Sequence, residues 1–417
     1  MKKAIVILSV LMLFAASSFA TRARVDSLGL NVSPWMVQDE YLTTKYFPQM
    51  VVNYDNMAKI EYGTAPVSGQ ANLNLGPGVL GVIANIPNVS LTIAPTVNST
   101  GAIYGLDMKG MSLGFGLTYG TIGTKNTTGA INGNVGGSYG YAALGHGMNF
   151  GVVAGLGVNL GKNMPLDLGL RLNIPSYYTI DNATVNATGV KTAQNQTGKT
   201  GIELAVDGRI SLPGDMMANV GVSLINSTNL ILVETFNGVS GTMLTHTEDA
   251  TAGTNIGFTI GVEKTVQVGS AMVIFGLDPF FNSNSTTETN ANKMPGGVKL
   301  AGDNLVGTTT IKIPLYVGVE NKLNETWLLR GGVSKNVWDL TSTVTKGKDI
   351  AGNVTSNTTA DVTADAAPAF TIGFGAKFGE VSIDGNVATS LLTNGPYFIT
   401  GAPSAFASEI AISYNWK

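Results

Sequence analysis

Two short stretches of the sequence match patterns that carry chemistry in other proteins. The stretch 136–140, with Ser138 between glycines and His146 nearby, has the spacing of a nucleophile elbow, in which a sharp turn exposes a serine for acyl transfer. Gly76 to Gly81 has the glycine spacing of a dinucleotide-binding turn. No helical pattern follows either stretch, so neither has the context that its chemistry requires. We therefore expect that the protein is not an enzyme.

Residues that hold metals or nucleic acids are also scarce. The chain of 417 residues has two histidines, His146 and His246, and no cysteine, which leaves no thiolate site and no disulfide framework. Its net charge of −3 lacks the basic surface that a nucleic-acid partner needs. We expect no metal site, no cofactor and no nucleic-acid partner.

The remaining charged side chains follow a regular pattern, because they recur opposite apolar residues at every second position. Asp167 and Arg171, for example, alternate with the leucines of 166–172. A period of two predicts a strand with one apolar and one polar face. These runs are about nine to twelve residues long, the length that a tilted strand needs to cross a bilayer. They lie at 111–119, 150–160, 166–174, 202–212, 256–263, 311–320, 370–378 and 381–387.

Connections between these runs are alternately short and long. The short ones include Lys109-Gly110 and Pro213 to Asp215, and the long ones are rich in Asn, Thr, Gly and Ser. A large soluble β-sandwich or solenoid would not show this asymmetry, whereas outer-membrane barrels do. We expect long loops at about 122–147, 176–199, 226–254, 284–308, 339–367 and 390–404.

The last residues, Ala405 to Lys417, also alternate, and their apolar face ends in Tyr414 and Trp416. This stretch resembles the closing strand of the bacterial outer-membrane β-barrels, although here Lys417 follows the aromatic residue. The resemblance implies an all-β, transmembrane antiparallel up-and-down β-barrel with short periplasmic turns and long extracellular loops. Counting back from Trp416, we expect about 14 strands, within a range of 12–16, and closure of the barrel at Tyr414 and Trp416.

The polar faces of such strands would line the lumen, because a charge that faces lipid costs a few kcal/mol. These charges either pair across strands as a structural feature or set the selectivity of a pore. Their excess of acid favours cations, and we expect Arg171 and Asp207 to lie within salt-bridge distance. The predicted lumen-lining residues are Asp167, Arg171, Glu203, Asp207, Arg209, Glu263, Lys312, Glu320, Arg330, Lys377, Asp384 and Glu409.

The N-terminal part divides into two segments that precede the barrel of residues 57–417. Residues 1–20 read as a cleaved signal peptide, with Lys2 and Lys3, an apolar run, and the small-x-small cleavage signal Ser18-Phe19-Ala20. Export of a chain of this kind predicts the cell outer membrane of a diderm bacterium. Residues 21–56 lack strand alternation, and we interpret them as a periplasmic or plug segment, with an irregular strand leader as the alternative.

Residues Tyr46 to Met50 occupy the place where the long-chain fatty acid transporters keep an Asn-Pro-Ala turn in their N-terminal hatch, and Pro48 is the residue in common. The similarity is to the N-terminal hatch of that family. The aromatic residues of 21–56 need burial, and the nearest cavity is the lumen or its periplasmic mouth, so we expect Trp35 and Pro48 to contact the inner wall and narrow the pore.

Passive transport of small solutes through a porin-like channel is the leading functional expectation. The alternatives are a plugged carrier of hydrophobic compounds, similar to the long-chain fatty acid transporters, and a structural or surface-exposed barrel without transport. The expected partners are outer-membrane lipid, the barrel-assembly machinery, and small solutes or a hydrophobic ligand. Nothing in the sequence indicates an oligomeric state.

Overall fold

The computed structural model describes residues 21–29, 46–63, 67–86, 99–125, 139–141, 144–161, 164–185, 191–236, 243–293, 304–349, 351, 353–364, 367–387 and 407–416. The predicted signal peptide, Trp35 and the serine of the elbow-like stretch lie outside these residues. Gly76 and Pro77 form the turn of a hairpin, which is incompatible with a dinucleotide-binding turn before a helix.

The described chain forms two short helices and nineteen strands. The helices are α2 (Arg22–Ser27) and the 3₁₀ helix η3 (Pro48–Asn53). The first strands are β1 (Met57–Gly63), β2 (Ser68–Leu75), β3 (Gly78–Ile86), β4 (Ser99–Met108), β5 (Met111–Lys125), β6 (Tyr139–Tyr141), β7 (Leu144–Asn159), β8 (Pro165–Val185), β9 (Lys191–Leu212) and β10 (Met216–Phe236). The others are β11 (Met243–Val268), β12 (Ala271–Leu277), β13 (Phe280–Lys293), β14 (Asn304–Lys322), β15 (Trp327–Lys348), β16 (Val354–Thr363), β17 (Ala369–Phe378), β18 (Val381–Val387) and β19 (Ala407–Asn415).

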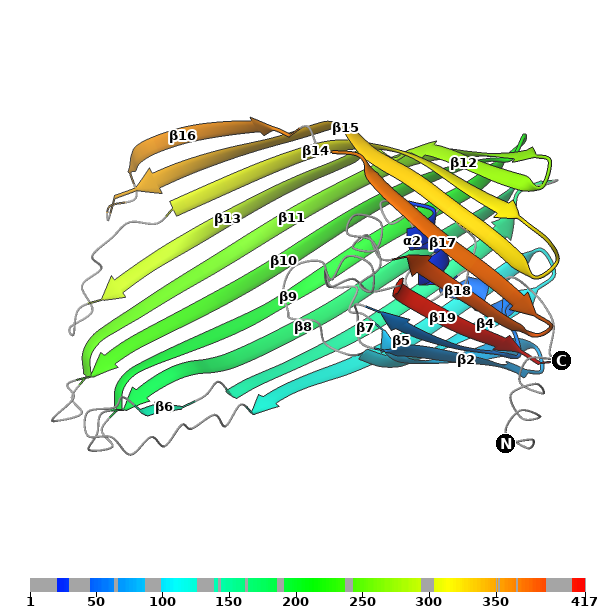
Figure 1. Ribbon diagram of the computed structural model, residues 1–417. Helices are drawn as coiled ribbons and strands as arrows, with labels where there is room; N and C mark the ends of the chain where they lie inside the picture. Colours follow the sequence, from blue (N-terminus) through cyan, green and yellow to red (C-terminus); the bar gives the residue numbers. More distant parts are fainter. Residues whose placement is uncertain are drawn as a thin grey trace, which may run out of the picture.

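The strands pair in sequence order and close into one antiparallel barrel (Figure 1). Three positions in the wall hold two strands each: β6 and β7 both pair with β8, β12 and β13 both pair with β11 and β14, and β16 and β17 both pair with β15. The barrel therefore has sixteen strands around its circumference, which corrects the expected number of about 14. The hairpin of β1 and β2, where the apolar alternation is short, supplies the two additional strands.

The barrel closes between the first and the last strand. In the register of β1 and β19, Ala58 lies opposite Tyr414, and the main-chain N–H of Trp416 donates to the carbonyl of Asn56 at 2.9 Å. The rings of Tyr414 and Trp416 lie 5.9 Å apart. The C-terminal residues thus hydrogen-bond directly to the start of the barrel, as expected from their alternation.

The barrel wall is much longer on one side than on the other (Figure 1). Strands β8 to β11 have 21 to 26 residues, whereas β1 to β4 and β17 to β19 have 7 to 10. At about 3.3 Å per residue, a strand of the length of β11 spans on the order of 85 Å, against ~30 Å for the hydrocarbon core of a bilayer.

This length corrects the prediction of long loops at several places. Much of 176–199, 226–254, 284–308 and 339–367 belongs to strands of the wall. In these strands Thr, Asn and Ser lie on both faces, so the sequence shows no alternation of apolar and polar residues. The main-chain hydrogen bonds of a sheet do not depend on that alternation. Threonine also favours strands, and threonine hydroxyls pair across strands, as at Thr200–Thr228, 2.7 Å apart.

The short connections lie at the end of the barrel where β1 begins and β19 ends (Figure 1). They use backbone conformations with positive φ, as at Gly110 (86°) in the turn between β4 and β5. Only glycine adopts such angles without a steric cost. This is why the predicted short turns at 109–110 and 213–215 are turns in the structure, where Gly214 also has positive φ.

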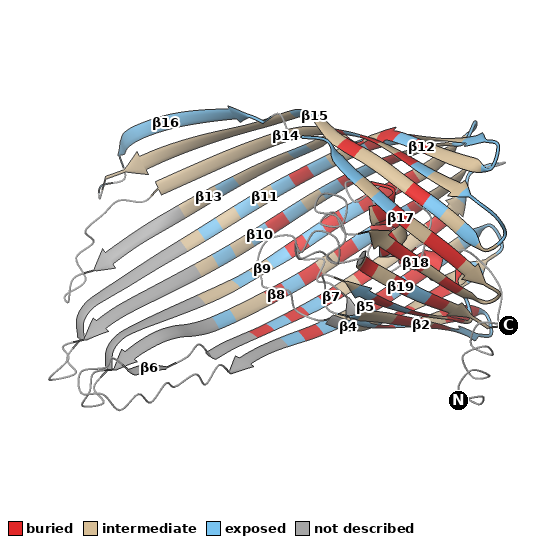
Figure 2. Ribbon diagram, viewed as in Figure 1, coloured by how far each residue is buried: buried red, intermediate tan, exposed pale blue. Residues whose placement is uncertain are grey.

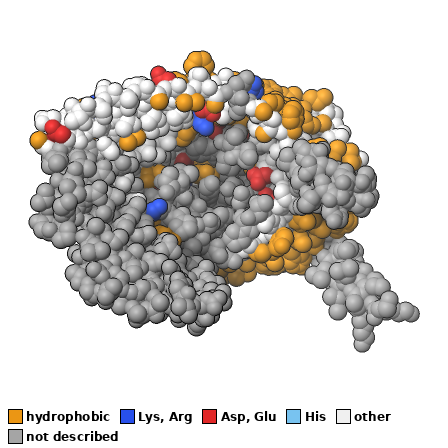
Figure 3. Space-filling model, turned by 60° about the vertical axis from the view of Figure 1, so that its left-hand side comes forward, with side chains coloured by type: hydrophobic (Ala, Val, Ile, Leu, Met, Phe, Trp, Pro, Cys, Tyr) orange, Lys and Arg blue, Asp and Glu red, His pale blue; other side chains and the backbone are white. Residues whose placement is uncertain are grey.

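The two faces of the short-turn half differ in burial, as Figure 2 shows by alternating red and pale blue. Phe115 and Leu117 of β5 are 52% and 44% exposed, whereas Gly114 and Gly116 are buried on the other face. Hydrophobic side chains accordingly gather on the outer wall, visible in orange in Figure 3. Within the described residues, neither helix is long and apolar enough to cross a membrane.

The two helices of the N-terminal segment lie inside the barrel. Leu28, directly after α2, and Phe47, directly before η3, are completely buried. Helix α2 packs against β15, β17, β18 and β19, while η3 packs against β3, β4, β5 and β7. The described part of this segment therefore lies in the lumen of the short-turn half.

Candidate functional site

Glycines on the inner wall, among them Gly114 and Gly155, leave the space that η3 occupies. A side-chain carbon at Gly114 of β5 would collide with the main chain of Pro48 and Gln49, and one at Gly155 of β7 would collide with the side chain of Gln49. Pro48 thus contacts the inner wall, as expected of this residue. The N-terminal segment occupies the space that Gly114 and Gly155 leave in the lumen.

We expect Gly114→Val to displace η3 and to lower the free energy of unfolding by about 1–3 kcal/mol, the usual effect of overpacking. The matched control is Gly307→Val in β14, where a side-chain carbon would have nothing within 4 Å. Surface changes of that kind stay within about ±0.5 kcal/mol. Urea unfolding of the purified barrel, followed by tryptophan emission, measures both. Equal midpoints for the two variants would contradict the close packing of η3 on the wall.

Buried charges surround η3. The guanidinium of Arg209 donates to Asp167 at 2.7 Å and lies 4.9 Å from the ring centre of Phe47. The side-chain amide of Gln49 donates to the same aspartate at 3.2 Å. Asp167 and Arg209 face each other in the register of β8 and β9. A charge pair inside a low-dielectric lumen is costly to break, so this cluster attaches η3 to the wall.

A second pair, Arg171 and Asp207, lies on the same two strands at 2.9 Å, which confirms the predicted ion pair. Arg171 also lies 4.7 Å from the ring centre of Tyr46, in cation–π geometry. Burial raises the pKa of the Tyr46 phenol to about 12, so this residue stays neutral at physiological pH. Tyr46 therefore presents a neutral aromatic ring with a polar hydroxyl, and the buried Arg171 holds this ring in place.

A third cluster attaches α2. Arg330 of β15 donates to Glu320 and to Asp384, each at 2.6 Å. Arg24 of α2 donates to Glu320 at 2.8 Å, and the Thr21 hydroxyl donates to Asp384 at 3.2 Å. The Arg330 guanidinium also donates to the carbonyl of Phe374 in β17, so groups from β14, β15, β17, β18 and α2 meet in one cluster around Arg330.

The structure places most predicted lumen residues on the inner face. Lys312 pairs with Asp339 at 3.2 Å and is 41% exposed at its side chain, while Glu320 and Lys377 are partly buried. The sequence prediction did not include Thr21, Arg24, Tyr46 or Gln49, because nothing in their local pattern indicates which strand they would meet. The predicted residues that are buried are Asp167, Arg171, Glu203, Asp207, Arg209, Glu263, Arg330, Asp384 and Glu409.

Acids outnumber bases among the buried charges of the described residues. Four bases, Lys59, Arg171, Arg209 and Arg330, are buried together with twice as many acids. Within the same residues, no group of three His, Cys, Asp or Glu side chains could hold a metal ion. The eight buried acids are Glu61, Asp167, Glu203, Asp207, Glu263, Asp278, Asp384 and Glu409.

Two prolines disturb the wall beside Tyr46. Asp278 and Pro279 separate β12 from β13, and Pro314 lies opposite them in β14. Proline has no N–H to donate, so the ladder is interrupted at each position. The pairing of β14 with β15 shifts by one residue at the same level, between Ile313 and Pro314. Three neighbouring wall positions are therefore irregular at one height.

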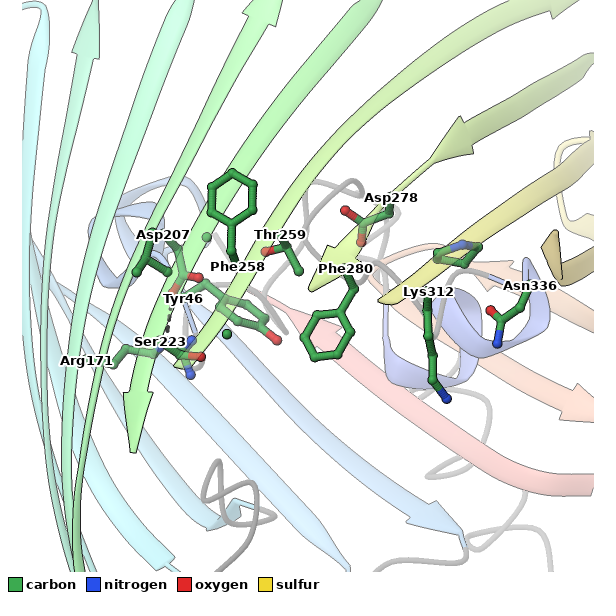
Figure 4. A pocket seen from close by; sticks show the side chains of 14 residues that line it. Tyr46, Arg171, Asp207, Ser223, Phe258, Thr259, Asp278, Phe280, Lys312 and Asn336 are labelled. Carbon is green, nitrogen blue, oxygen red and sulfur yellow. Dashed lines mark hydrogen bonds and ion pairs between the residues drawn. The ribbon is translucent and has the colours of Figure 1, made fainter. Parts of the chain in front are cut away.

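A cavity of about 430 Å³ lies between this irregular wall and Tyr46. Figure 4 shows the ring of Tyr46 between the Arg171–Asp207 pair on one side and Phe280 on the other. Ser223 and Thr259 supply hydroxyls, and Asn336 and Lys312 supply hydrogen-bond donors. A cavity of this size with aromatic and polar walls suits a small organic molecule. Its remaining lining residues are Gly221, Val222, Gly257, Phe258, Asp278 and Pro314.

No protein-family model matches the sequence, and the comparison with curated proteins found no match. Several solved barrels are similar in structure. The Pseudomonas putida toluene transporter TodX is 9% identical, with 97% of this chain and 100% of that chain covered and a TM-score of 0.40. The ferric-catecholate import receptor Fiu from E. coli K12 is 9% identical, with 87% and 74% covered and a TM-score of 0.36. The translocator domain of the autotransporter NalP from Neisseria meningitidis is 14% identical, with 74% and 90% covered and a TM-score of 0.25. No conclusion about function follows from likenesses at these TM-scores.

Proposed function

We propose that this protein is a plugged outer-membrane transporter of small organic solutes. The observation that carries the proposal is the buried N-terminal segment: Leu28 and Phe47 are completely buried inside a closed barrel whose outer face is apolar. A barrel of sixteen strands is otherwise wide enough for an aqueous channel. The plugged carrier therefore accounts for a lumen that holds this buried segment better than an open porin does.

Placement in the outer membrane is supported by the exposed apolar residues of the short-turn half. Phe115, Leu170, Val206 and Ile260 are 45–52% exposed and belong to strands of the same wall. A soluble monomer rarely exposes a continuous apolar patch of more than a few hundred Å². Lipid would cover this band, and the polar parts of β8 to β11 and of β13 to β16 that lie farthest from the short turns would project beyond it.

The proposed substrate contains both apolar and hydrogen-bonding groups. The cavity offers the rings of Tyr46 and Phe280 together with the hydroxyls of Ser223 and Thr259. Its charges are largely paired with one another, as in Arg171–Asp207, so neutral or zwitterionic molecules suit it better than strongly charged ones.

Proteoliposome swelling tests this function with a monosaccharide and an aromatic amino acid as solutes. We expect Ser223→Phe, which fills the cavity, to slow entry of the aromatic solute several-fold. The control is Ser227→Phe, four residues along the same face of β10 and away from the cavity. Equal rates for both variants would refute the cavity as the route. Absence of entry in the unaltered protein would instead favour a structural barrel, for which the tall polar wall is the supporting observation.

A further inference from the structure

Thr21, the first described residue, is completely buried although it precedes every helix and strand that the structure describes. Its hydroxyl donates to a carboxylate oxygen of Asp384 in β18 at 3.2 Å, and it accepts from the main-chain N–H of Arg24. In the precursor, the nitrogen of Thr21 belongs to the peptide bond with Ala20. The predicted cleavage signal, Ser18-Phe19-Ala20, ends at this bond.

We propose that cleavage between Ala20 and Thr21 creates an ammonium group that binds Asp384 inside the barrel, so that processing itself attaches the N-terminal segment to the lumen. In the cleavage reaction, water adds across the peptide bond, Ala20 leaves as a carboxylate, and the amino group of Thr21 takes up a proton. A neutral amide becomes a cation on a residue whose hydroxyl already donates to a buried carboxylate.

The surroundings of Thr21 suit an additional positive charge. The charged groups of the cluster are Arg24 on α2, Glu320 on β14, Arg330 on β15 and Asp384 on β18. Arg330 is shared between both carboxylates, and buried acids exceed buried bases two to one among the described residues. The four charged groups of the cluster offset one another, so a new cation reduces the acid excess of the lumen as a whole, and charge-assisted hydrogen bonds are the strong ones.

Geometry supports the same pairing. The hydroxyl oxygen and the main-chain nitrogen of one threonine are three bonds apart, so the carboxylate that binds the hydroxyl lies within a few ångströms of the nitrogen. The other oxygen of Asp384 accepts from Arg330 at 2.6 Å. A carboxylate has about four acceptor positions, so it can accept both cations.

Labelling of the N-terminal amine tests the proposal on the folded barrel purified from outer membranes. A succinimidyl ester reacts with free amines, and digestion after glutamate releases residues 21–40, which contain no lysine. Label on this fragment therefore reports the Thr21 amine alone. We expect the folded protein to react at least ~10-fold more slowly than the heat-denatured protein, because labelling must wait for local opening.

Two variants and one control complete the test. Inserting Gly-Ser after Ala20 displaces the amine and should raise labelling of the folded barrel towards the denatured rate. Asp384→Asn should accelerate labelling several-fold, whereas Asp361→Asn on the exposed strand β16 should not. A mature chain that begins elsewhere, fast labelling of the folded barrel, or protection that is insensitive to Asp384→Asn would each overturn the proposal. If Asp384→Asn does not assemble, the insertion decides, and none of these measurements depends on whether the barrel transports a solute.

Discussion

Removing residues 21–50 from the mature chain is expected to raise the single-channel conductance of the barrel several-fold. These residues include α2 and half of η3, whose buried side chains occupy the lumen between opposite walls. Their removal would leave water in a barrel wide enough to conduct. The deletion also removes Arg24 and so increases the acid excess of the lumen, and the opened pore should prefer cations. Planar-bilayer recordings measure the conductance, and reversal potentials in a salt gradient measure the preference.

The deletion is informative only if the barrel still assembles. The closing contacts of β19 with β1 do not involve the deleted residues, so assembly should persist, and heat-dependent mobility in gels checks it. Unchanged conductance in an assembled barrel would mean that the segment does not limit the pore, and the plugged transporter would lose its main support. Anion preference would contradict the assignment of the buried acids to the lumen.

Arg330→Met is expected to destabilise the barrel by about 3–5 kcal/mol, the usual cost of leaving a buried charge without its partner. Arg330 is 3% exposed and donates to both Glu320 and Asp384 at 2.6 Å. Its loss would leave two carboxylates with less compensation and would weaken the anchoring of α2. Urea unfolding of the folded barrel in detergent measures the change.

Lys312→Met is the matched control, because it removes a cation of the same inner wall from a single carboxylate. The side chain of Lys312 is 41% exposed and its distance to Asp339 is 3.2 Å, so the loss should be no more than about 1 kcal/mol. If the two variants were equally stable, the cluster around Arg330 would not hold the fold together, and α2 would need another explanation for its position.

The sequence by itself determined the wall of the barrel in its short-turn half. Alternation in 111–119 identified the two faces of β5, because a side chain that faces away from the lumen must be apolar or small whatever its neighbours are. Gly110 marked a turn because its backbone conformation is unfavourable for other residues. Arg171 and Asp207 could be paired in advance, because they lie at similar depth on consecutive antiparallel strands, whereas the Asp167–Arg209 pair was not predicted.

Only the tertiary structure decided where the wall ends and what the lumen contains. Polar residues such as those of 226–254 give no alternation. Their strands form because the main chain of each strand hydrogen-bonds to the main chain of the neighbouring strand. Arg24 and Glu320 are 296 residues apart in the sequence. Arg330 and Asp384 are 54 residues apart, and the wall position that β16 and β17 share lies between their strands. Contacts of this kind depend on closure of the whole barrel, which brings β14, β15 and β18 around α2. No local pattern records that arrangement, because burial of a charge depends on partners that only the closed sheet brings together.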